Sequence, residues 1–273
     1  MVMNLDGKTA LVTGSTDGVG RVVAQRLAAA GARVLIHGRD VDRGRRAVAD
    51  ISKAGGTAAF VPADFGCLAE VRRLADTIRQ RETRLDILIN NAGIGTAGTS
   101  RQTSADGHEL RFAVNYLAGF LLTRLLLPLI KASTPARIVN VSSAGQQPLD
   151  FRDVMLTHDY SGRRAYCQSK LAQVMFTIDL AQELAGSGIT VNALHPATYM
   201  DTAMVRRAGV TPMSSVDEGA EAILNLAASP DLAACSGRYF NGLREARADR
   251  QAYDDTARRR LMEISAELTA AYR

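Results

Sequence analysis

A tyrosine and a lysine stand four residues apart in the segment AYCQSK, residues 165–170. Residues with this spacing share one face of a helix, so the phenol of Tyr166 and the ammonium of Lys170 would lie side by side. A tyrosine pKa of about 10 is too high for proton exchange near neutrality, and a neighbouring ammonium favours the phenolate. The spacing therefore predicts a tyrosine that donates and accepts protons. A helix surface on which the tyrosine packs against the lysine stem is the alternative.

Three glycines, Gly14, Gly18 and Gly20, follow the first apolar run in TGSTDGVG, where a helix is expected to begin. Glycine permits a tight turn and lets the backbone approach a ligand closely. A helix N-terminus adds free N–H groups and the positive end of a dipole, which bind phosphate. The pattern predicts a pyrophosphate site for a dinucleotide after the first strand. A plain tight turn uses the same residues.

The second apolar run ends in RVLIHGRD, at the position expected to meet the adenosine ribose. A carboxylate there would accept from a 2′-hydroxyl, whereas an arginine would pair with a 2′-phosphate. Gly38 stands at the strand end and Arg39 follows it, which favours NADP(H) over NAD(H). His37 is interpreted as a strand residue, and Asp40 has an alternative role as the cap of the next helix.

Short apolar runs that are typical of strands alternate with helical patterns along the chain. The expected strands are TALVT, RVLIH, TAAFV, LDILIN, RIVNVS, ITVNAL and GRYF. Between them lie helical stretches such as GRVVAQRLAAAG, AEVRRLADTIRQ and SKLAQVMFTIDLAQEL. This alternation predicts an α/β fold, a doubly wound parallel sheet of about seven strands with helices on both faces.

Composition narrows the class of protein. The 273 residues are 47% hydrophobic and 22% charged, and the net charge is +5. The three cysteines are widely spaced, which suits reduced thiols in a cytoplasm. The start of the chain has no secretory pattern, and the apolar stretch FLLTRLLLPLI is short and interrupted by Arg124. We expect a soluble, cytoplasmic protein that binds neither nucleic acid nor membrane, and the four histidines have no metal-ligand spacing.

Five motifs occur in order: the glycine loop, NNAG at 90–93, Asn115, NVSS at 140–143 and YCQSK at 166–170. In this combination the chain resembles the short-chain dehydrogenase/reductase family over nearly its whole length. The segments RRAYCQSKLAQVMFT, SGRYF and RRRLMEISAEL resemble its retinol-dehydrogenase-like branch most closely. The resemblance implies one Rossmann-type domain over residues 1–273. It also implies hydride transfer between nicotinamide and a carbonyl or alcohol carbon, with Tyr166 as general acid/base.

The resemblance also implies roles for individual residues. Ser143, rather than the competing Ser142, would hold the substrate oxygen beside Tyr166. Lys170 would additionally bind the nicotinamide ribose, a double task for which arginine is too bulky and forked. Asn115 would anchor a water that links Lys170 to solvent, although a mid-helix asparagine can equally be a buried polar group.

Cofactor contacts are expected along the carboxyl edge of the sheet. The resemblance places Asp64 near adenine and Asn91 to Gly93 along the adenosine, although Asn90 and Asn91 could simply end a strand. The full set of expected cofactor-binding residues is Gly14, Ser15, Thr16, Asp17, Gly18, Val19, Gly20, Arg39, Asp64, Phe65, Asn91, Ala92, Gly93, Tyr166, Lys170, Pro196, Thr198 and Thr202.

Some positions depart from the family pattern. Ala197 replaces a glycine after the sixth strand, and Asp17 stands where several NADP-dependent relatives carry a basic residue. Thr202 is expected to reach the carboxamide, with Thr198 as the alternative. A substrate loop is expected over about 197–215, with Met200, Met204, Val210 and Met213 as either an apolar lid or ordinary packing. Residues 148–162 could form a substrate wall, and a helical tail is expected over about 244–273.

The expected partner is therefore NADP(H) together with a small apolar carbonyl or alcohol, and a homo-oligomer is compatible with the sequence. The other hypothesis is a catalytically silent NADP(H)-binding regulatory protein on the same fold, since fold does not fix function. The presence of Asn115, Ser143, Tyr166 and Lys170 together argues for the enzyme.

Overall fold

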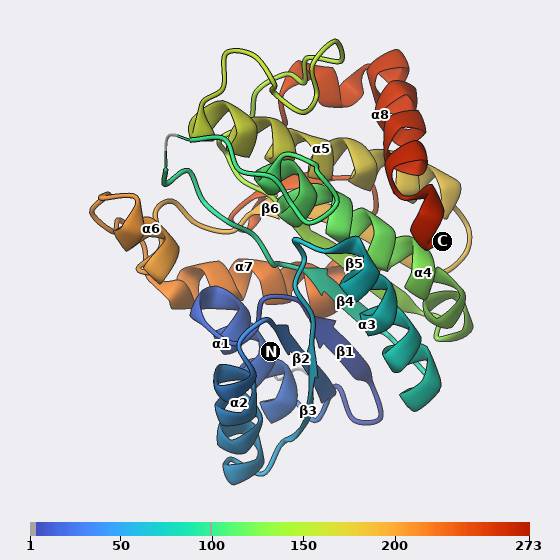
Figure 1. Ribbon diagram of the computed structural model, residues 1–273. Helices are drawn as coiled ribbons and strands as arrows, with labels where there is room; N and C mark the ends of the chain where they lie inside the picture. The colour runs from blue at the N-terminus through green and yellow to red at the C-terminus, as the bar shows by residue number, and fades with distance from the viewer. Residues whose placement is uncertain (1–3, 99) are drawn as a thin grey trace.

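An eight-stranded, mostly parallel sheet forms the centre of the computed structural model, which describes residues 4–98 and 100–273 (Figure 1). The strands lie in the order β3-β2-β1-β4-β5-β6-β7-β8. Their bounds are β1 Thr9–Val12, β2 Arg33–Gly38, β3 Thr57–Pro62, β4 Ile87–Asn90, β5 Ala136–Val141, β6 Ile189–His195, β7 Tyr239–Asn241 and β8 Arg244–Ala246. The winding reverses between β1 and β4, the point at which doubly wound sheets place their ligands.

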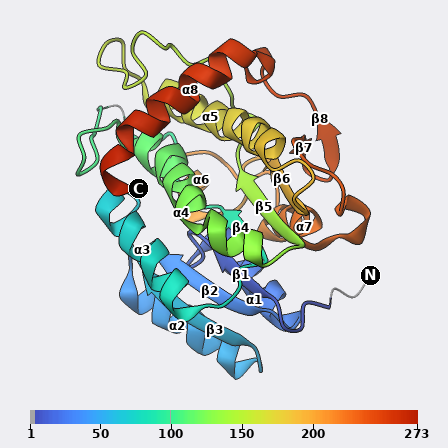
Figure 2. The same ribbon diagram turned by 90° about the vertical axis from the view of Figure 1, so that its right-hand side faces the viewer.

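Helices cover both faces of the sheet and enclose two cores (Figure 2). One face carries α1 (Gly18–Ala29), α2 (Val41–Lys53) and α7 (Val216–Ala228), and the other carries α3 (Leu68–Arg81), α4 (Ala118–Ala132) and α5 (Gly162–Glu183). Successive strand side chains point to opposite faces, so Leu11 enters one core and Val12 the other. The predicted doubly wound α/β fold is confirmed.

The seven expected strands are present, and one further strand, β8, also forms. It pairs antiparallel with β7, with Asn241 opposite Arg244. The sequence of β8, REA, shows no apolar alternation, so no pattern marks it as a strand. The first residues of the expected helical tail therefore form an edge strand of the sheet. Its helix is α8, Asp255–Leu268, and the remaining short helices are α6 Ala203–Arg207, η2 Pro230–Leu232, η3 Arg250–Tyr253 and η4 Ala270–Tyr272.

The helix that carries the tyrosine–lysine pair begins directly against a loop. Ser161 caps α5 by accepting a hydrogen bond from the amide of Arg164. A Cβ built on Gly162 would stand 2.6 Å from the carbonyl oxygen of Gly98 and 2.8 Å from that of Thr96. Glycine at the first position of α5 therefore permits this contact, which fixes the start of the helix relative to the segment after β4.

The segment Phe112–Ala132, made of the π-helix η1 (Phe112–Leu117) and α4, is long and apolar enough to cross a membrane. We expected a shorter apolar stretch here, and the continuous helical segment has 21 residues. In this fold, 78% of its most apolar window is buried, as in the core helix of a soluble protein.

Candidate active site

The turn after β1 packs so closely that two of its glycines have no room for a side chain. A Cβ on Gly14, whose φ is +64°, would stand 2.8 Å from Ala92 Cα, and one on Gly20 would stand 2.4 Å from the carbonyl oxygen of Gly14. Asn91 ties this turn to the end of β4, because its Nδ2 donates to the carbonyl oxygens of Thr13 and Gly14. The structure thus brings the glycine loop and the NNAG segment together at the switch point of the sheet.

His37 is a strand residue that also hydrogen-bonds the glycine turn. Its Nδ1 accepts from the amide of Gly14 at 3.1 Å, so its Nε2 carries the hydrogen and donates to the carbonyl oxygen of Ala63 at 3.2 Å. Burial lowers the pKa of His37 to about 4. Phe65, which is expected to contact the cofactor, packs its buried ring against the imidazole, with the two centroids 4.3 Å apart.

Two arginines stand at the end of β2, where a ribose phosphate is expected. Arg39 has 69% of its side chain exposed, and its Nη1 lies 3.7 Å from Asp64 Oδ2. Arg43, in the first turn of α2, was not predicted. It pairs with Asp17 at 3.3 Å and with Asp40 at 3.4 Å. Asp40 caps α2 and Asp17 caps α1, so the capping alternative for Asp40 is confirmed.

Other expected cofactor residues of the glycine loop face the protein interior. The hydroxyl of Ser15 is fully buried and donates to the carbonyl oxygen of Val12 at 2.6 Å, and Val19 is buried in the core under α1. Thr16 covers the strand end, because a Cβ on Gly38 would stand 2.7 Å from its methyl carbon. Ser15 and Val19 thus shape the turn with buried side chains, whereas the side chain of Thr16 is only partly buried.

The two serines that follow β5 have different roles. The hydroxyl of Ser142 is buried and donates to the carbonyl oxygen of Lys170 at 2.7 Å, so it fastens α5 to the sheet. The hydroxyl of Ser143 accepts from the amide of Gly145 at 3.1 Å and hydrogen-bonds the phenol of Tyr166. The structure therefore places Ser143, and not Ser142, beside the tyrosine.

Burial dominates the protonation of the tyrosine–lysine pair. It raises the pKa of Tyr166 above its ordinary value, while the hydrogen bond from Ser143 acts in the opposite direction. It also lowers the pKa of Lys170 to about 7. The ammonium lies 5.8 Å from the centre of the tyrosine ring and donates to the carbonyl oxygen of Val141 and to Gln173. In the protein without cofactor, burial therefore has a larger effect on the pKa of Tyr166 than the nearby ammonium, and the expected lowering by Lys170 together with a bound nicotinamide stays a prediction.

Asn115 lies in the π-helix η1, and such turns occur frequently at functional sites. Its Oδ1 accepts from the amide of Ile94 at 2.7 Å, and its Nδ2 donates to the carbonyl oxygen of Ile94 and to Ser169. The side chain thus acts as the buried polar group that was one of its two interpretations. It also holds Gly93 in place, where a Cβ would stand 3.2 Å from Asn115 Oδ1 and 3.5 Å from Lys170 Nζ.

The segment after β6 reaches back over the glycine loop. Pro196 is buried at its start, and Thr198 lies 3.2 Å from Nε2 of His195. Thr202 caps α6, and its methyl carbon would lie 3.5 Å from a Cβ on Gly18. Of the two threonines considered for the carboxamide, Thr202 is the one beside the glycine loop.

Sequence reasoning missed two side chains that hold Ser143. The hydroxyl of Tyr239 and the Nε2 of Gln146 both donate to the carbonyl oxygen of Ser143, at 3.0 Å and 2.7 Å. The Oε1 of Gln146 in turn accepts from the amide of Asp249 at 2.9 Å. Tyr239 lies in SGRYF, which served only as a sign of the family branch. The C-terminal segment thus supports the serine.

A buried cluster joins the segment after β4 to the 148–162 loop. Arg111 donates to the carbonyl oxygens of Gly95 and Ala97 and to the hydroxyl of Tyr160. That hydroxyl donates to Glu109, whose carboxylate is 1% exposed and lies 3.8 Å from the guanidinium. The cluster anchors the proposed substrate wall to the same segment against which α5 begins.

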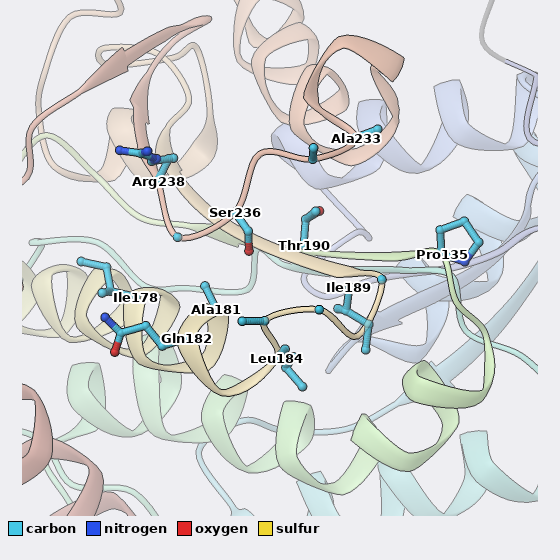
Figure 3. Close-up of a pocket in the computed structure, with 15 residues that line it drawn as sticks. Pro135, Ile178, Ala181, Gln182, Leu184, Ile189, Thr190, Ala233, Ser236 and Arg238 are labelled. Atoms are coloured by element: carbon cyan, nitrogen blue, oxygen red, sulfur yellow. The ribbon is translucent and has the colours of Figure 1, made fainter.

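A surface cavity of about 610 Å³ lies away from these residues, at the amino ends of β5 and β6 (Figure 3). Small and apolar side chains dominate its lining, which includes Pro135, Ile178, Ala181, Leu184, Ile189 and Ala233. Ser143 and Tyr166 stand at the opposite, carboxyl end of the strands, so this cavity is separate from the candidate active site.

The family model described as short chain dehydrogenase matches residues 8–211. The chain therefore belongs to the short-chain dehydrogenase/reductase family of oxidoreductases. Within that family it is of the retinol-dehydrogenase-like branch. Human retinol dehydrogenase 13 is 39% identical to it over 285 residues, which cover 97% of this chain and 85% of that protein.

Solved structures show the same fold. An uncharacterised protein from Mycobacterium paratuberculosis superposes with a TM-score of 0.81 and 31% identity, over 98% of this chain and 96% of the other. The complex of Pseudomonas aeruginosa RhlG with NADP superposes with a TM-score of 0.73 and 30% identity, over 88% of this chain and 96% of the other.

Proposed function

We propose that this protein is an NADP(H)-dependent oxidoreductase that interconverts an alcohol and a carbonyl, with Tyr166 as general acid and base. The observation that carries the proposal is the convergence of Ser143, Tyr166 and Lys170 at the carboxyl edge of the sheet, beside the glycine loop. The related RhlG structure, which is a complex with NADP, supports the choice of cofactor.

The residues around the glycine loop fit a dinucleotide phosphate. The tight packing at Gly14 and Gly20 keeps the backbone bare where α1 begins, as a bound pyrophosphate requires. Arg39 and Arg43 present two partly exposed guanidiniums, which suit a 2′-phosphate. Their present carboxylate partners are exposed, and such ion pairs are worth only about 0–1 kcal/mol, so a phosphate can displace them.

Bound NADP(H) supplies or accepts the hydride. The side chains of the protein act on the substrate oxygen: Ser143 donates a hydrogen bond to it, and Tyr166 protonates it during reduction and removes the proton during oxidation. Because burial raises the pKa of Tyr166 and lowers that of Lys170, the proton resides on the tyrosine. This is the state that donates a proton to the carbonyl oxygen during reduction.

The proposed substrate is small and apolar. The 197–215 segment exposes large apolar side chains: 49% of Tyr199, 39% of Met204 and 72% of Met213. Met204 also lies over Gly95, since a Cβ there would stand 2.7 Å from the Met204 side chain. The unbranched side chains of a methionine-rich segment next to the site can adapt to apolar ligands of different shapes.

The test is nicotinamide oxidation by purified protein against aldehydes, ketones and quinones, with NADPH and NADH in parallel. Tyr166→Phe removes only the hydroxyl and should lower kcat by about two to four orders of magnitude. The matched control is Tyr272→Phe, whose hydroxyl bonds Asp106 near the C-terminus and should leave turnover unchanged.

Full activity of Tyr166→Phe would contradict the acid–base role. Turnover chiefly with NADH would contradict the role of Arg39 and Arg43. Binding of NADPH without turnover of any compound would favour the silent regulatory protein.

A further inference from the structure

We propose that Gln173 is a positioning residue for Lys170, and that a neutral amide is needed there because it holds the ammonium without cancelling its charge. The inference adds a residue to the proposed function and rests on the role given to Lys170. Nζ of Lys170 donates to Oε1 of Gln173 at 2.9 Å and to the carbonyl oxygen of Val141 at 2.9 Å. Both side chains are buried, with Lys170 5% and Gln173 4% exposed.

These two hydrogen bonds fix the orientation of the Lys170 ammonium. A lysine ammonium has three hydrogens, and Gln173 and Val141 occupy two of them. On the side of the NNAG segment, Gly93 faces the nitrogen with only backbone, since a Cβ there would stand 3.5 Å from Nζ. The third hydrogen is therefore available toward the segment proposed to line the cofactor. The fixed backbone carbonyl and the carboxamide one helical turn away define its direction.

Three kinds of side chain at position 173 would affect the Lys170 ammonium differently. An amide oxygen accepts a hydrogen bond and leaves the net positive charge in place. A carboxylate would form an ion pair and offset the field that the ammonium exerts on Tyr166. An aliphatic side chain would leave a buried charge with one acceptor fewer, which is costly. The titratable groups facing Lys170 are Tyr166 on α5 and His195 at the end of β6, and the charge of Lys170 contributes to lowering the pKa of His195.

The scarcity of lysine makes a direct test practical, because the chain has lysine only at positions 8, 53, 131 and 170. Protein labelled with ε-¹³C-lysine gives four Cε signals, whose chemical shifts report ionisation of each amine. The signal that disappears in Lys170→Met is assigned to Lys170. The titration needs neither cofactor nor substrate.

We expect Lys170 in the wild type to titrate near pH 7, in keeping with its buried position. Gln173→Glu should raise this midpoint by about one pH unit or more, because a carboxylate favours the charged amine. Gln173→Met should lower it by about half a unit, because one acceptor is lost. Gln168→Met is the control: Gln168 lies on the same helix, is equally buried and donates to Pro148 instead, so the midpoint should not move.

Equal midpoints in wild type, Gln173→Glu and Gln173→Met would overturn the proposal. If Gln173→Met does not fold, Gln173→Glu decides alone: a raised midpoint supports the contact and an unchanged one refutes it. Because the titration is independent of turnover, it separates this inference from the proposed function, which the turnover assays with NADPH, NADH and Tyr166→Phe test.

Discussion

At the residue scale, burial affects the pKa values of Tyr166 and Lys170 more than the proximity of the two side chains does. Tyr166 and Lys170 share a helix face as their spacing predicts, yet the pKa of the tyrosine is raised and that of the lysine is lowered. Both shifts have the same cause, since a low-dielectric surrounding disfavours the charged form of either group. The sequence identifies the pair but contains no information on how deeply the fold encloses it.

His37 gives a prediction about stability and pH. Its pKa is about 4 in the folded protein against an ordinary value of 6.5, so the unfolded chain binds a proton more readily than the folded one. Stability should therefore be complete above about pH 6.5 and fall as the pH drops toward about 4, by about 3 kcal/mol in total from this residue. Urea unfolding at a series of pH values measures this loss.

The variant His37→Gln cannot titrate and should show a smaller loss of stability on acidification. His158→Gln is the matched control, because the side chain of His158 is 87% exposed. If wild type and His37→Gln lose stability in parallel between neutral and acidic pH, the buried imidazole is not the cause.

At the scale of elements, the cluster of Glu109, Arg111 and Tyr160 joins two segments that flank the start of α5. Arg111→Met would remove the contacts to Gly95, Ala97 and Tyr160 and leave the buried Glu109 carboxylate without its cation. Breaking a buried charge pair from one side typically costs about 3–5 kcal/mol, and we expect a loss of this size in the free energy of unfolding.

The double variant Glu109→Gln/Arg111→Met should recover part of that loss, because no uncompensated charge remains. The two single variants and the double variant form a cycle that urea unfolding can measure. Strictly additive losses would show that the two charges do not interact.

The sequence predicted the elements and most of the site for a simple physical reason. Strands buried on both faces read as apolar runs, and the glycine loop and the tyrosine–lysine pair have fixed spacings. What it could not predict depends on contacts between distant segments. Arg43, His37 and Tyr239 act through partners far along the chain or on another element, and β8 forms because β7 offers it a free edge.

At the scale of the whole molecule, we propose that the chain unfolds as one cooperative unit. The sheet is continuous, and the strands β1 to β7 contribute side chains to the cores on both of its faces. The tail joins this unit through Arg258, whose buried guanidinium pairs with Asp179 of α5 at 2.5 Å and also contacts Asp255.

Far-UV circular dichroism and the reactivity of the buried Cys167 thiol should therefore report one urea transition with the same midpoint. Two separated transitions would instead show that the nucleotide-binding and C-terminal parts unfold independently.

The hydrogen bond from Tyr239 to Ser143 can form only late in biosynthesis. The two residues are 96 positions apart, so at about 5–20 residues per second the serine leaves the ribosome roughly 5–20 s before its support. The nascent chain can assemble β1 to β4 and the glycine loop during this interval. Tyr239 can donate its hydrogen bond to Ser143 only when the last part of the message has been translated. A chain released early would therefore carry the glycine loop while lacking the hydrogen bond from Tyr239 that supports Ser143.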